Sequence, residues 1–187
     1  LAAVDEALTR VFGDRLRQPD IAAAAATLRP LIDACTVEGR PLFAGHLAQE
    51  WPTEPHLALW FAITLLREYR GDGHIAALVV EGVSGLEALL IHAGTGFVPA
   101  AVLQGTRGWS DDAWAAARDR LQARGWLDDE GLLAPAGQQH RNRVEQYTDE
   151  LAAAPWARLS DDQVTTLGAL GKELSAAIVA AGTFPLR

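Results

Sequence analysis

The chain has 187 residues, of which 49% are hydrophobic, and its formal net charge at pH 7 is −8. This size and composition suffice to bury one good core or two small ones. The negative charge argues against broad attraction to nucleic acid, because phosphate neutralisation by Lys and Arg supplies most non-specific DNA affinity. We expect no transmembrane helix and no secretory signal, because no apolar run is long enough and no basic-then-apolar pattern opens the chain. The single cysteine, Cys35, excludes an intramolecular disulfide and fits a reducing cytoplasm, where we place the protein.

The first half of the chain predicts helices separated by Pro and Gly. Apolar spacing predicts helices over 1–12, 19–36, 42–50, 56–69 and 74–82. The fourth is apolar almost all round, which indicates a buried central helix, and GDG at 71–73 is expected to stop it. We assign 1–83 to a helical domain. Because the sequence contains no Met and begins inside a helical pattern, we expect a further segment upstream.

The segment 84–134 predicts a winged helix-turn-helix. LEALLIHAG and VPAAVLQGTRG indicate two short helices, and WSDDAWAAARDRLQARG indicates a longer third one. Ser110 is a good N-cap for the third helix, with carboxylates in its first turn. GWLDDEGLLA has the pattern of two short strands around a polar turn, which predicts a β-hairpin wing. The predicted fold class is therefore mainly α, with one small wing.

The last part, 135–187, predicts two long helices that could mediate dimerisation. Pro135 opens a helix that is expected to run to about Ala153, where Pro155 ends it. Ser160 and Gln163 have the spacing of a capping box for the final helix. That helix presents one continuous apolar face.

This order of elements resembles the MarR-type winged-helix regulators over about 86–181. The best match is RLQARGWLDDEGLLAPAG, which is similar to the end of a recognition helix, a wing and the start of a long helix, and LSDDQ is similar to the start of a final dimerisation helix. Across the chain, WPTEPHLALW, LREYRGDGHIAAL and TRGWSDDAW together resemble an actinobacterial family of helix-turn-helix-like proteins with no assigned chemistry. The resemblance implies a homodimeric, ligand-responsive transcriptional regulator that binds DNA.

The candidate DNA-binding residues are arginines in and before the third helix, because Arg can contact guanine with two hydrogen bonds. They are Arg107, Arg118, Arg120 and Arg124. The alternative is that these arginines form local ion pairs on a solvated face. The charge favours the alternative, since 110–134 holds three arginines against six carboxylates. Three of those carboxylates, Asp128, Asp129 and Glu130, occupy the expected tip of the wing, where the MarR-type proteins carry basic residues.

A second candidate site lies along the central helix. At 100° per residue, one side carries histidine, tryptophan and arginine, followed by a further histidine after the GDG turn. The residues are His56, Trp60, Arg67, Arg70 and His74. Together they could hold a small aromatic or anionic ligand. The alternative is that Trp60 belongs to the core and that the arginines cap the last carbonyls of the helix.

No motif indicates a metal, a nucleophile or a phosphate loop, so we predict no metal site and no catalytic residues, and the cofactor is unknown. Two functions remain. The leading interpretation is the ligand-responsive regulator, and the alternative is a small-molecule-binding protein or enzyme on a winged-helix scaffold that has lost DNA binding. Enzyme activity is the less favoured of these interpretations. A protein-interaction module is a third option.

Overall fold

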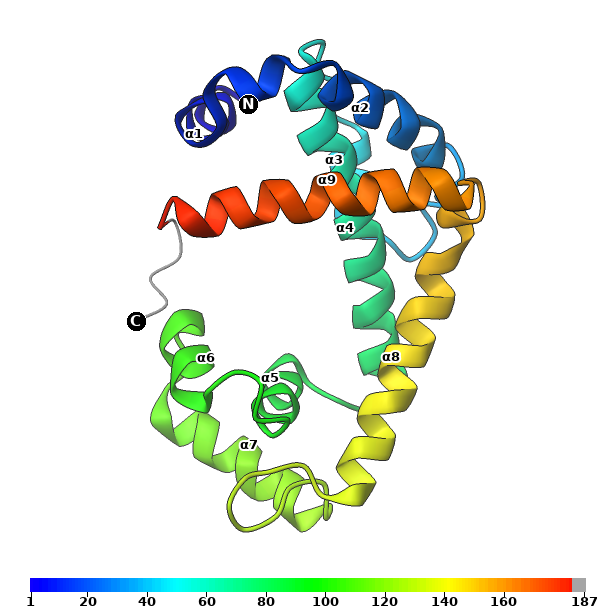
Figure 1. Cartoon of the computed structure of the whole chain (residues 1–187). Coiled ribbons are helices and arrows are strands. Elements are labelled where there is room, and N and C mark those ends of the chain that lie inside the picture. The colour runs from blue at the N-terminus through cyan, green and yellow to red at the C-terminus, as the bar shows by residue number, and fades with distance from the viewer. Residues whose placement is uncertain (183–187) are drawn as a thin grey trace. The chain divides into compact units, whose positions relative to one another are not determined.

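The structure, a computed structural model, describes residues 1–182, which are helical or form turns and loops (Figure 1). The α-helices are α1 (Ala2–Phe12), α2 (Pro19–Ile32), α3 (Pro41–Leu47), α4 (Pro55–Val80), α5 (Gly85–Ala93), α6 (Ala100–Arg107), α7 (Asp111–Ala123), α8 (Pro135–Trp156) and α9 (Asp161–Ala180), with a 3₁₀ segment η1 (Gly13–Arg17) after α1. They form two compact units. The first contains residues 1–72 and the chain from Ala152 onward, and the second contains Gly73–Leu151.

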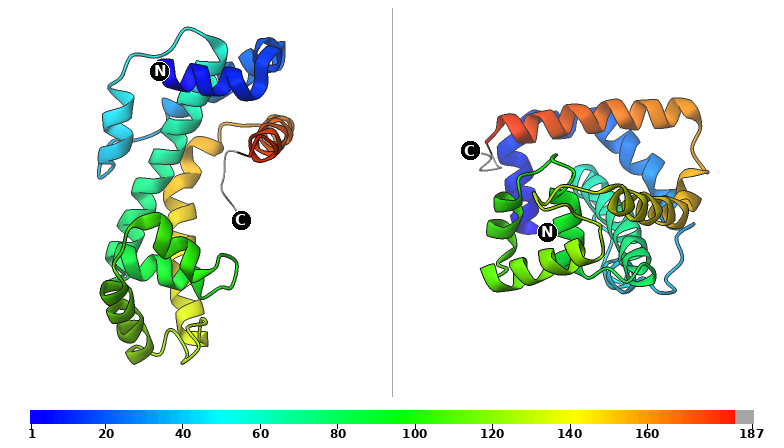
Figure 2. Two further views of the ribbon diagram at one scale, coloured as in Figure 1. Left: turned by 90° about the vertical axis from the view of Figure 1, so that its left-hand side faces the viewer. Right: turned by 90° about the horizontal axis from the view of Figure 1, so that it is seen from below.

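The core of the first unit lies among α2, α3, the first part of α4 and one side of α9, which Figure 2 shows from two further directions. Its buried side chains include Ile21, Leu28, Leu31, Phe43, Phe61, Leu65, Tyr69 and Leu170. Leu170 comes from the apolar face of α9, and Leu167 and Leu174 pack against the same core. The apolar face that the sequence assigned to dimerisation is therefore used, in part, within the chain.

The central helix does not stop at the GDG sequence, as the pattern predicted, because α4 continues to Val80. Asp72 lies between the two glycines and is buried, and its Oδ2 accepts a hydrogen bond from the backbone N–H of Phe43 at 2.9 Å. Arg40 lies over the Tyr69 ring and donates to the Tyr69 carbonyl. These contacts hold the helix through two glycines, each of which costs about 1 kcal/mol relative to Ala.

The second unit is built around α5, α6 and α7. Its buried residues include Leu86, Leu90, Ile91, Leu103, Trp114, Ala117, Leu121, Trp126, Leu127 and Val144. Ser84 begins α5 with a capping box, in which Glu87 returns a hydrogen bond to the Ser84 backbone. Glu87 is buried and also binds Arg120 Nε on α7 at 3.2 Å. Burial alone would raise the pKa of Glu87, but the hydrogen bonds from Ser84 and Arg120 bring it below its usual range.

The predicted β-hairpin wing is wrong. Over 126–134 the described chain forms one isolated antiparallel bridge, between Leu127 and Leu133, and no strand. The Asp128 carboxylate accepts hydrogen bonds from two backbone N–H groups of the turn, which closes the loop tightly just beyond the bridge. The N–H of Leu133 donates to the carbonyl of Gly94, away from the facing segment. Two cross-segment hydrogen bonds flank the bridge, from the N–H of Asp128 to the Leu132 carbonyl and from the N–H of Ala134 to the Trp126 carbonyl, but the N–H of Leu132, which would return a bond to the Asp128 carbonyl, donates to the Asp128 carboxylate instead. The pairing therefore stops at one bridge, and residues 1–182 form a mainly α fold without a sheet.

The predicted caps of the later helices are confirmed. Ser110 accepts a hydrogen bond from the backbone N–H of Ala113, and Ser160 forms a complete capping box with Gln163. Pro155, which was expected to end α8, lies inside its last turn and is buried.

Within residues 1–182 no single helix is long and apolar enough to cross a membrane. Only α4 and α5 taken together pass that test, by length and composition alone, and a bend of 96° separates them.

Candidate functional site

The connection between α6 and α7 has the length and the glycine that are typical of the turn in a helix-turn-helix. Three residues, Gly108 to Ser110, connect the two helices. Gly108 ends α6 with φ 68°, a left-handed conformation that glycine adopts without strain, and Ser110 then caps α7. A three- to four-residue turn that contains glycine is typical of this motif, in which the helix after the turn enters the major groove. By position, α7 corresponds to the helix that enters the major groove in DNA-binding examples of this motif.

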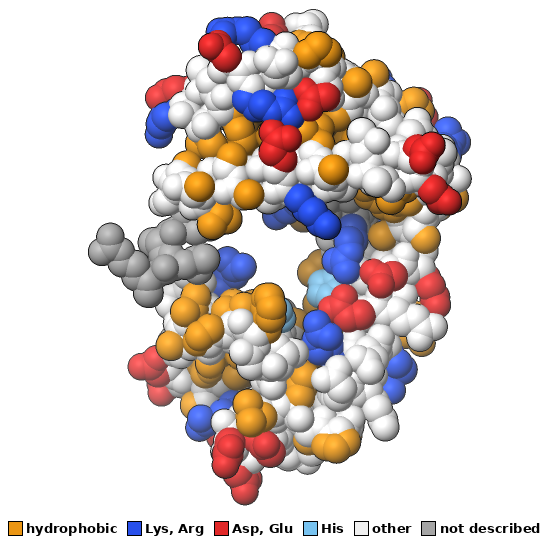
Figure 3. Space-filling view, in the orientation of Figure 1, with side chains coloured by type: hydrophobic (Ala, Val, Ile, Leu, Met, Phe, Trp, Pro, Cys, Tyr) orange, Lys and Arg blue, Asp and Glu red, His pale blue; other side chains and the backbone are white. Residues whose placement is uncertain are grey.

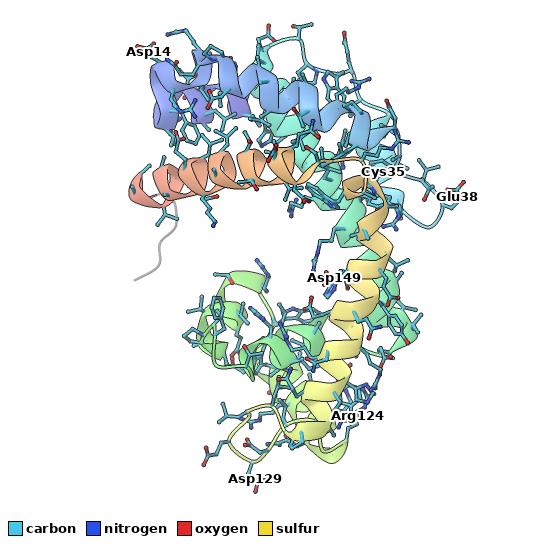
Figure 4. All side chains as sticks on the ribbon, turned by 45° about the vertical axis from the view of Figure 1, so that its right-hand side comes forward. Asp14, Cys35, Glu38, Arg124, Asp129 and Asp149 are labelled. Atoms are coloured by element: carbon cyan, nitrogen blue, oxygen red, sulfur yellow. The ribbon has the colours of Figure 1, made fainter. Side chains whose placement is uncertain are left out.

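The outward face of α7 is acidic. Trp114, Ala117 and Leu121 are buried, so at 100° per residue the opposite side carries Asp112 and Asp119 among alanines. No arginine lies at the centre of this side. Beyond the helix, exposed acidic side chains gather where the loop after α7 lies (Figure 3). Asp129 lies at the tip of that loop (Figure 4). A helix with this face meets DNA phosphates with like charge.

Two of the four predicted DNA-binding arginines are bound within the unit. Arg120 pairs with the buried Glu87 and donates to the Ala116 carbonyl. Arg124 donates to the Gly82 carbonyl at 3.3 Å and lies over the Trp126 ring. The ion-pair alternative thus describes Arg120, whereas Arg124 binds a carbonyl and an aromatic ring.

Arg118 is exposed and makes no hydrogen bond or ion pair with another described residue. Arg107, the last residue of α6, lines a pocket. Contact of these four arginines with DNA stays a prediction.

The pocket belongs entirely to the second unit and has a volume of about 320 Å³. More than half of its lining is apolar and comes from α4, α5, α6 and α8 and the residues between them: Leu78, Val83, Ala88, Leu89, Ile91, Leu103 and Val144. The polar lining consists of His74, His92, Arg107, His140, Arg141 and Glu145. A mostly apolar cleft with a few convergent polar groups is the usual form of a small-molecule site.

Arg107 is the one guanidinium of this lining that has no partner among the described residues. The other, Arg141, lies 3.5 Å from Glu145 one turn along α8. No hydrogen bond or ion pair joins Arg107 to any residue of 1–182. The pocket therefore presents one positive charge without a counter-charge, that of Arg107, beside its apolar lining.

A polar cluster supports the wall of the pocket at His140. Its Nδ1 lies 2.8 Å from Glu81 Oε2, and its ring lies 3.7 Å, centroid to centroid, from that of Trp126. Arg143 binds the same carboxylate at 3.1 Å. The hydrogen bonds from Arg143 and His140 hold the pKa of Glu81 below its usual range, although burial acts in the opposite direction. The carboxylate thus stays ionised and fixes the His140 ring.

His74 is positioned by α8. Its Nδ1 lies 2.9 Å from the hydroxyl oxygen of the buried Thr148, which in turn donates to the Val144 carbonyl at 2.6 Å. Because the Thr148 hydroxyl has a single hydrogen, its oxygen is left to accept one from His74 Nδ1. This contact fixes the ring against the pocket.

The other residues of the predicted ligand site lie elsewhere along α4. His56 Nε2 is 2.7 Å from Asp5 Oδ1, and Trp60 packs against the core of the first unit. Arg67 is exposed and pairs with its neighbour Glu68, and Arg70 is exposed on the same helix. A helix rises about 1.5 Å per residue, so His56 and Arg70 are roughly 21 Å apart along it. Of the predicted five, the structure brings only His74 to the pocket.

His92, His140 and Arg141 were missed as ligand-site residues, and Arg107 was assigned to DNA. His92 lies in the last turn of α5, whereas His140 and Arg141 lie near the start of α8, about fifty residues later. No spacing along the sequence relates them. The pairing of Arg141 with Glu145 at i and i+4 is the one local signal, and it indicates an ordinary helix-surface pair.

Cys35 behaves as expected for an inert thiol. It is partly buried at the edge of the first core, and burial raises its pKa to about 11.

The turn, the cap and the position of α7 define a helix-turn-helix protein. In agreement with this, a family model described as a helix-turn-helix family matches residues 1–185, and the chain belongs to that family. No curated protein and no solved structure matches the chain. Membership supports the helix-turn-helix prediction, while the MarR-type and actinobacterial assignments stay predictions.

Proposed function

We propose that this protein is a ligand-binding helix-turn-helix protein whose working site is the pocket of the second unit. The observation that carries the proposal is the position of this pocket. It lies within the unit that holds the helix-turn-helix and is lined by Leu103 and Arg107 of α6, the helix before the turn. Its volume is at the lower end of the range typical of small-molecule sites.

The acidic outward side of α7 argues against binding of duplex DNA through a helix in the major groove. A major-groove helix gains affinity from cations that replace counterions on phosphates. Here Asp112 and Asp119 occupy the outward face, and Arg120 is held by Glu87. Ligand binding rather than DNA recognition is therefore the function that the site supports best.

Thermal-shift screening against aromatic acids, tetrapyrroles and flavins tests the ligand site, because a ligand that binds the native state raises the melting temperature. Ala88→Leu fills the pocket from α5, and Ala116→Leu adds the same side chain on the exposed face of α7. We expect every true hit to be lost in the first variant and kept in the second. If all hits survive Ala88→Leu with unchanged affinity, the pocket is not the ligand site.

A DNA-binding regulator of MarR type is the second candidate, and family membership together with the three-residue turn favours it. Such a protein would act as a homodimer in the cytoplasm. An electrophoretic mobility shift with random duplexes at about 50 mM salt tests it, since electrostatic affinity is greatest at low salt. Binding that weakens steeply with salt would support this candidate. If no duplex binds, ligand binding without DNA recognition is the candidate that stands. Light scattering would measure the oligomeric state.

A further inference from the structure

Helix α6 is the least supported part of the helix-turn-helix. It has eight residues, and Leu103 is its one buried residue. Its N-cap, Pro99, makes no side-chain capping hydrogen bond, and Gly105 lies within its last turn. A helix this short is not stable on its own in water, and glycine costs about 1 kcal/mol in a helix interior. Contacts on one side must therefore hold α6 in place.

Two side chains of α6 line the pocket, the buried Leu103 and the exposed Arg107. Leu103 and Arg107 are four residues apart, so they lie one above the other on the same side of the helix. Leu103 belongs to the apolar lining of the pocket, whereas Arg107 is the last residue of the helix, immediately before the turn to α7. Whatever fills the pocket thus contacts the inward side of α6.

The charges around the pocket specify the sign of the occupant. Arg141 and Glu145 pair with each other, and Arg107 has no partner among the described residues. The three histidines of the lining are neutral or positive in charge. An anionic group would bind Arg107, while a cation would meet an unpaired guanidinium. The planar fork of arginine matches a carboxylate with two parallel hydrogen bonds.

We infer that the pocket binds an amphipathic carboxylate whose charged end pairs with Arg107 and whose apolar body packs on Leu103, so that ligand binding holds α6 and the turn to α7. This inference rests on the proposed function, that the pocket is a ligand site. The occupied pocket supplies the missing counter-charge and completes the packing under a marginal helix. Binding therefore couples to the order of the helix-turn-helix.

Three probes that share one apolar body separate the effect of charge from that of shape: 2-naphthoate, the neutral 2-naphthamide and the cationic 2-naphthylmethylamine. Isothermal titration should show that the carboxylate binds about tenfold or more tightly than the amide, because charge-assisted hydrogen bonds are roughly twice as strong as neutral ones. The amine should bind most weakly. Arg107→Gln should lower the affinity of the carboxylate to that of the amide. Arg118→Gln removes an exposed arginine outside the pocket lining and should leave all three affinities unchanged.

Hydrogen exchange followed by mass spectrometry measures the effect on α6. Without ligand, the amides of 100–107 should exchange faster than those of α5 and α7. Saturating 2-naphthoate should slow exchange in 100–107 in the wild type and in Arg118→Gln, and do so much less in Arg107→Gln.

Two results would overturn the inference. One is equal binding of the carboxylate and the amide, and the other is binding that leaves exchange in α6 unchanged. If an uncharged or cationic probe binds and Ala88→Leu abolishes its binding, the ligand site stands and only the inferred ligand class is wrong. If none of the probes and none of the screened compounds is sensitive to Ala88→Leu, the proposed function itself fails.

Discussion

Gly137→Ala should destabilise the protein, because this position in the first turn of α8 has no room for a side chain. A Cβ atom built on Gly137 would lie 2.1 Å from the backbone oxygen of Trp126. Ordinary contact begins at 3.4 Å, so loop and helix would have to separate by more than an ångström. The obstacle is backbone and cannot rotate away as the end of a flexible side chain can. It is also fixed, since the same oxygen accepts a hydrogen bond from the N–H of Ala134.

The size of the effect follows from two opposing contributions. Replacing glycine by alanine in a helix gains up to about 1 kcal/mol from helix propensity. Forcing an extra methyl group into a packed site costs about 1–3 kcal/mol, and more where backbone must move. Because the obstacle is backbone, the cost lies at or above the upper end of that range, so we expect the free energy of unfolding to fall by about 2 kcal/mol or more. For a chain of this length, each kcal/mol corresponds to roughly 2–4 °C in melting temperature.

Gly168→Ala is the matched control, because nothing lies within 4 Å of a Cβ atom built at this position inside α9. The same chemical change should raise the free energy of unfolding there by up to about 1 kcal/mol. Urea denaturation followed by circular dichroism measures both variants. If Gly137→Ala proves as stable as Gly168→Ala, the close approach of the 126–134 loop to α8 is refuted.

Three further predictions concern single polar contacts. Arg143 holds the pKa of Glu81 in the folded protein below the value of about 4.3 in an unfolded chain. The ionised Glu81 therefore adds to the free energy of unfolding in full above that pH, and this stabilisation is lost as the pH falls through the folded pKa. Glu81→Gln should therefore be less stable than the wild type at pH 7 yet lose less stability between pH 7 and 3, as read from urea midpoints. Asp72→Ala leaves the buried N–H of Phe43 without its acceptor and should lower the free energy of unfolding by about 1–3 kcal/mol in urea titration, whereas an unchanged value would contradict the α3–α4 contact. Ser160→Ala removes the cap of α9 and should cost about 1 kcal/mol by thermal melting, and a neutral result would show that the capping box adds nothing.

The features predicted correctly from the sequence depend on residues close together in the chain. Ser110 caps α7 through a backbone N–H three residues away, and Ser160 and Gln163 form their box within one turn. The prediction that GDG ends the central helix failed because it considered only the low helix propensity of glycine. The helix is held there by a contact distant in sequence, between Asp72 and Phe43, which lies 29 residues earlier. Propensity is a weak prior that tertiary contacts override.

The wing prediction identified two segments that do meet, since Leu127 and Leu133 form a bridge. What the alternating pattern could not show is where the other hydrogen-bonding groups go. The Asp128 carboxylate accepts hydrogen bonds from two N–H groups of the turn, one of which, that of Leu132, would otherwise pair with the Asp128 carbonyl and continue the ladder. This competition from a side chain of the turn limits the pairing to one bridge, and the alternation of apolar and polar residues does not reveal it.

The pocket could not be predicted because it is assembled from helices far apart in the sequence. The predicted stripe along α4 assumed that one side of one helix forms one site. Over fourteen residues that side crosses from the core of the first unit, at Trp60, to the pocket of the second, at His74. Periodicity places residues on a side, but which neighbour covers each stretch of that side depends on the fold.

The position of each charge changes the argument about DNA more than the count of charges does. Of the six carboxylates in 110–134, Asp111 accepts a hydrogen bond from Gln104 across the turn, and Asp128 is bonded within its own loop. Asp112 and Asp119 are the ones that α7 presents outward. Among the cations, Arg120 is neutralised by a buried glutamate. A segment with a negative net charge can still present a basic surface. In this chain, however, the outward side of α7 is itself acidic, so it would repel phosphates that approach the helix.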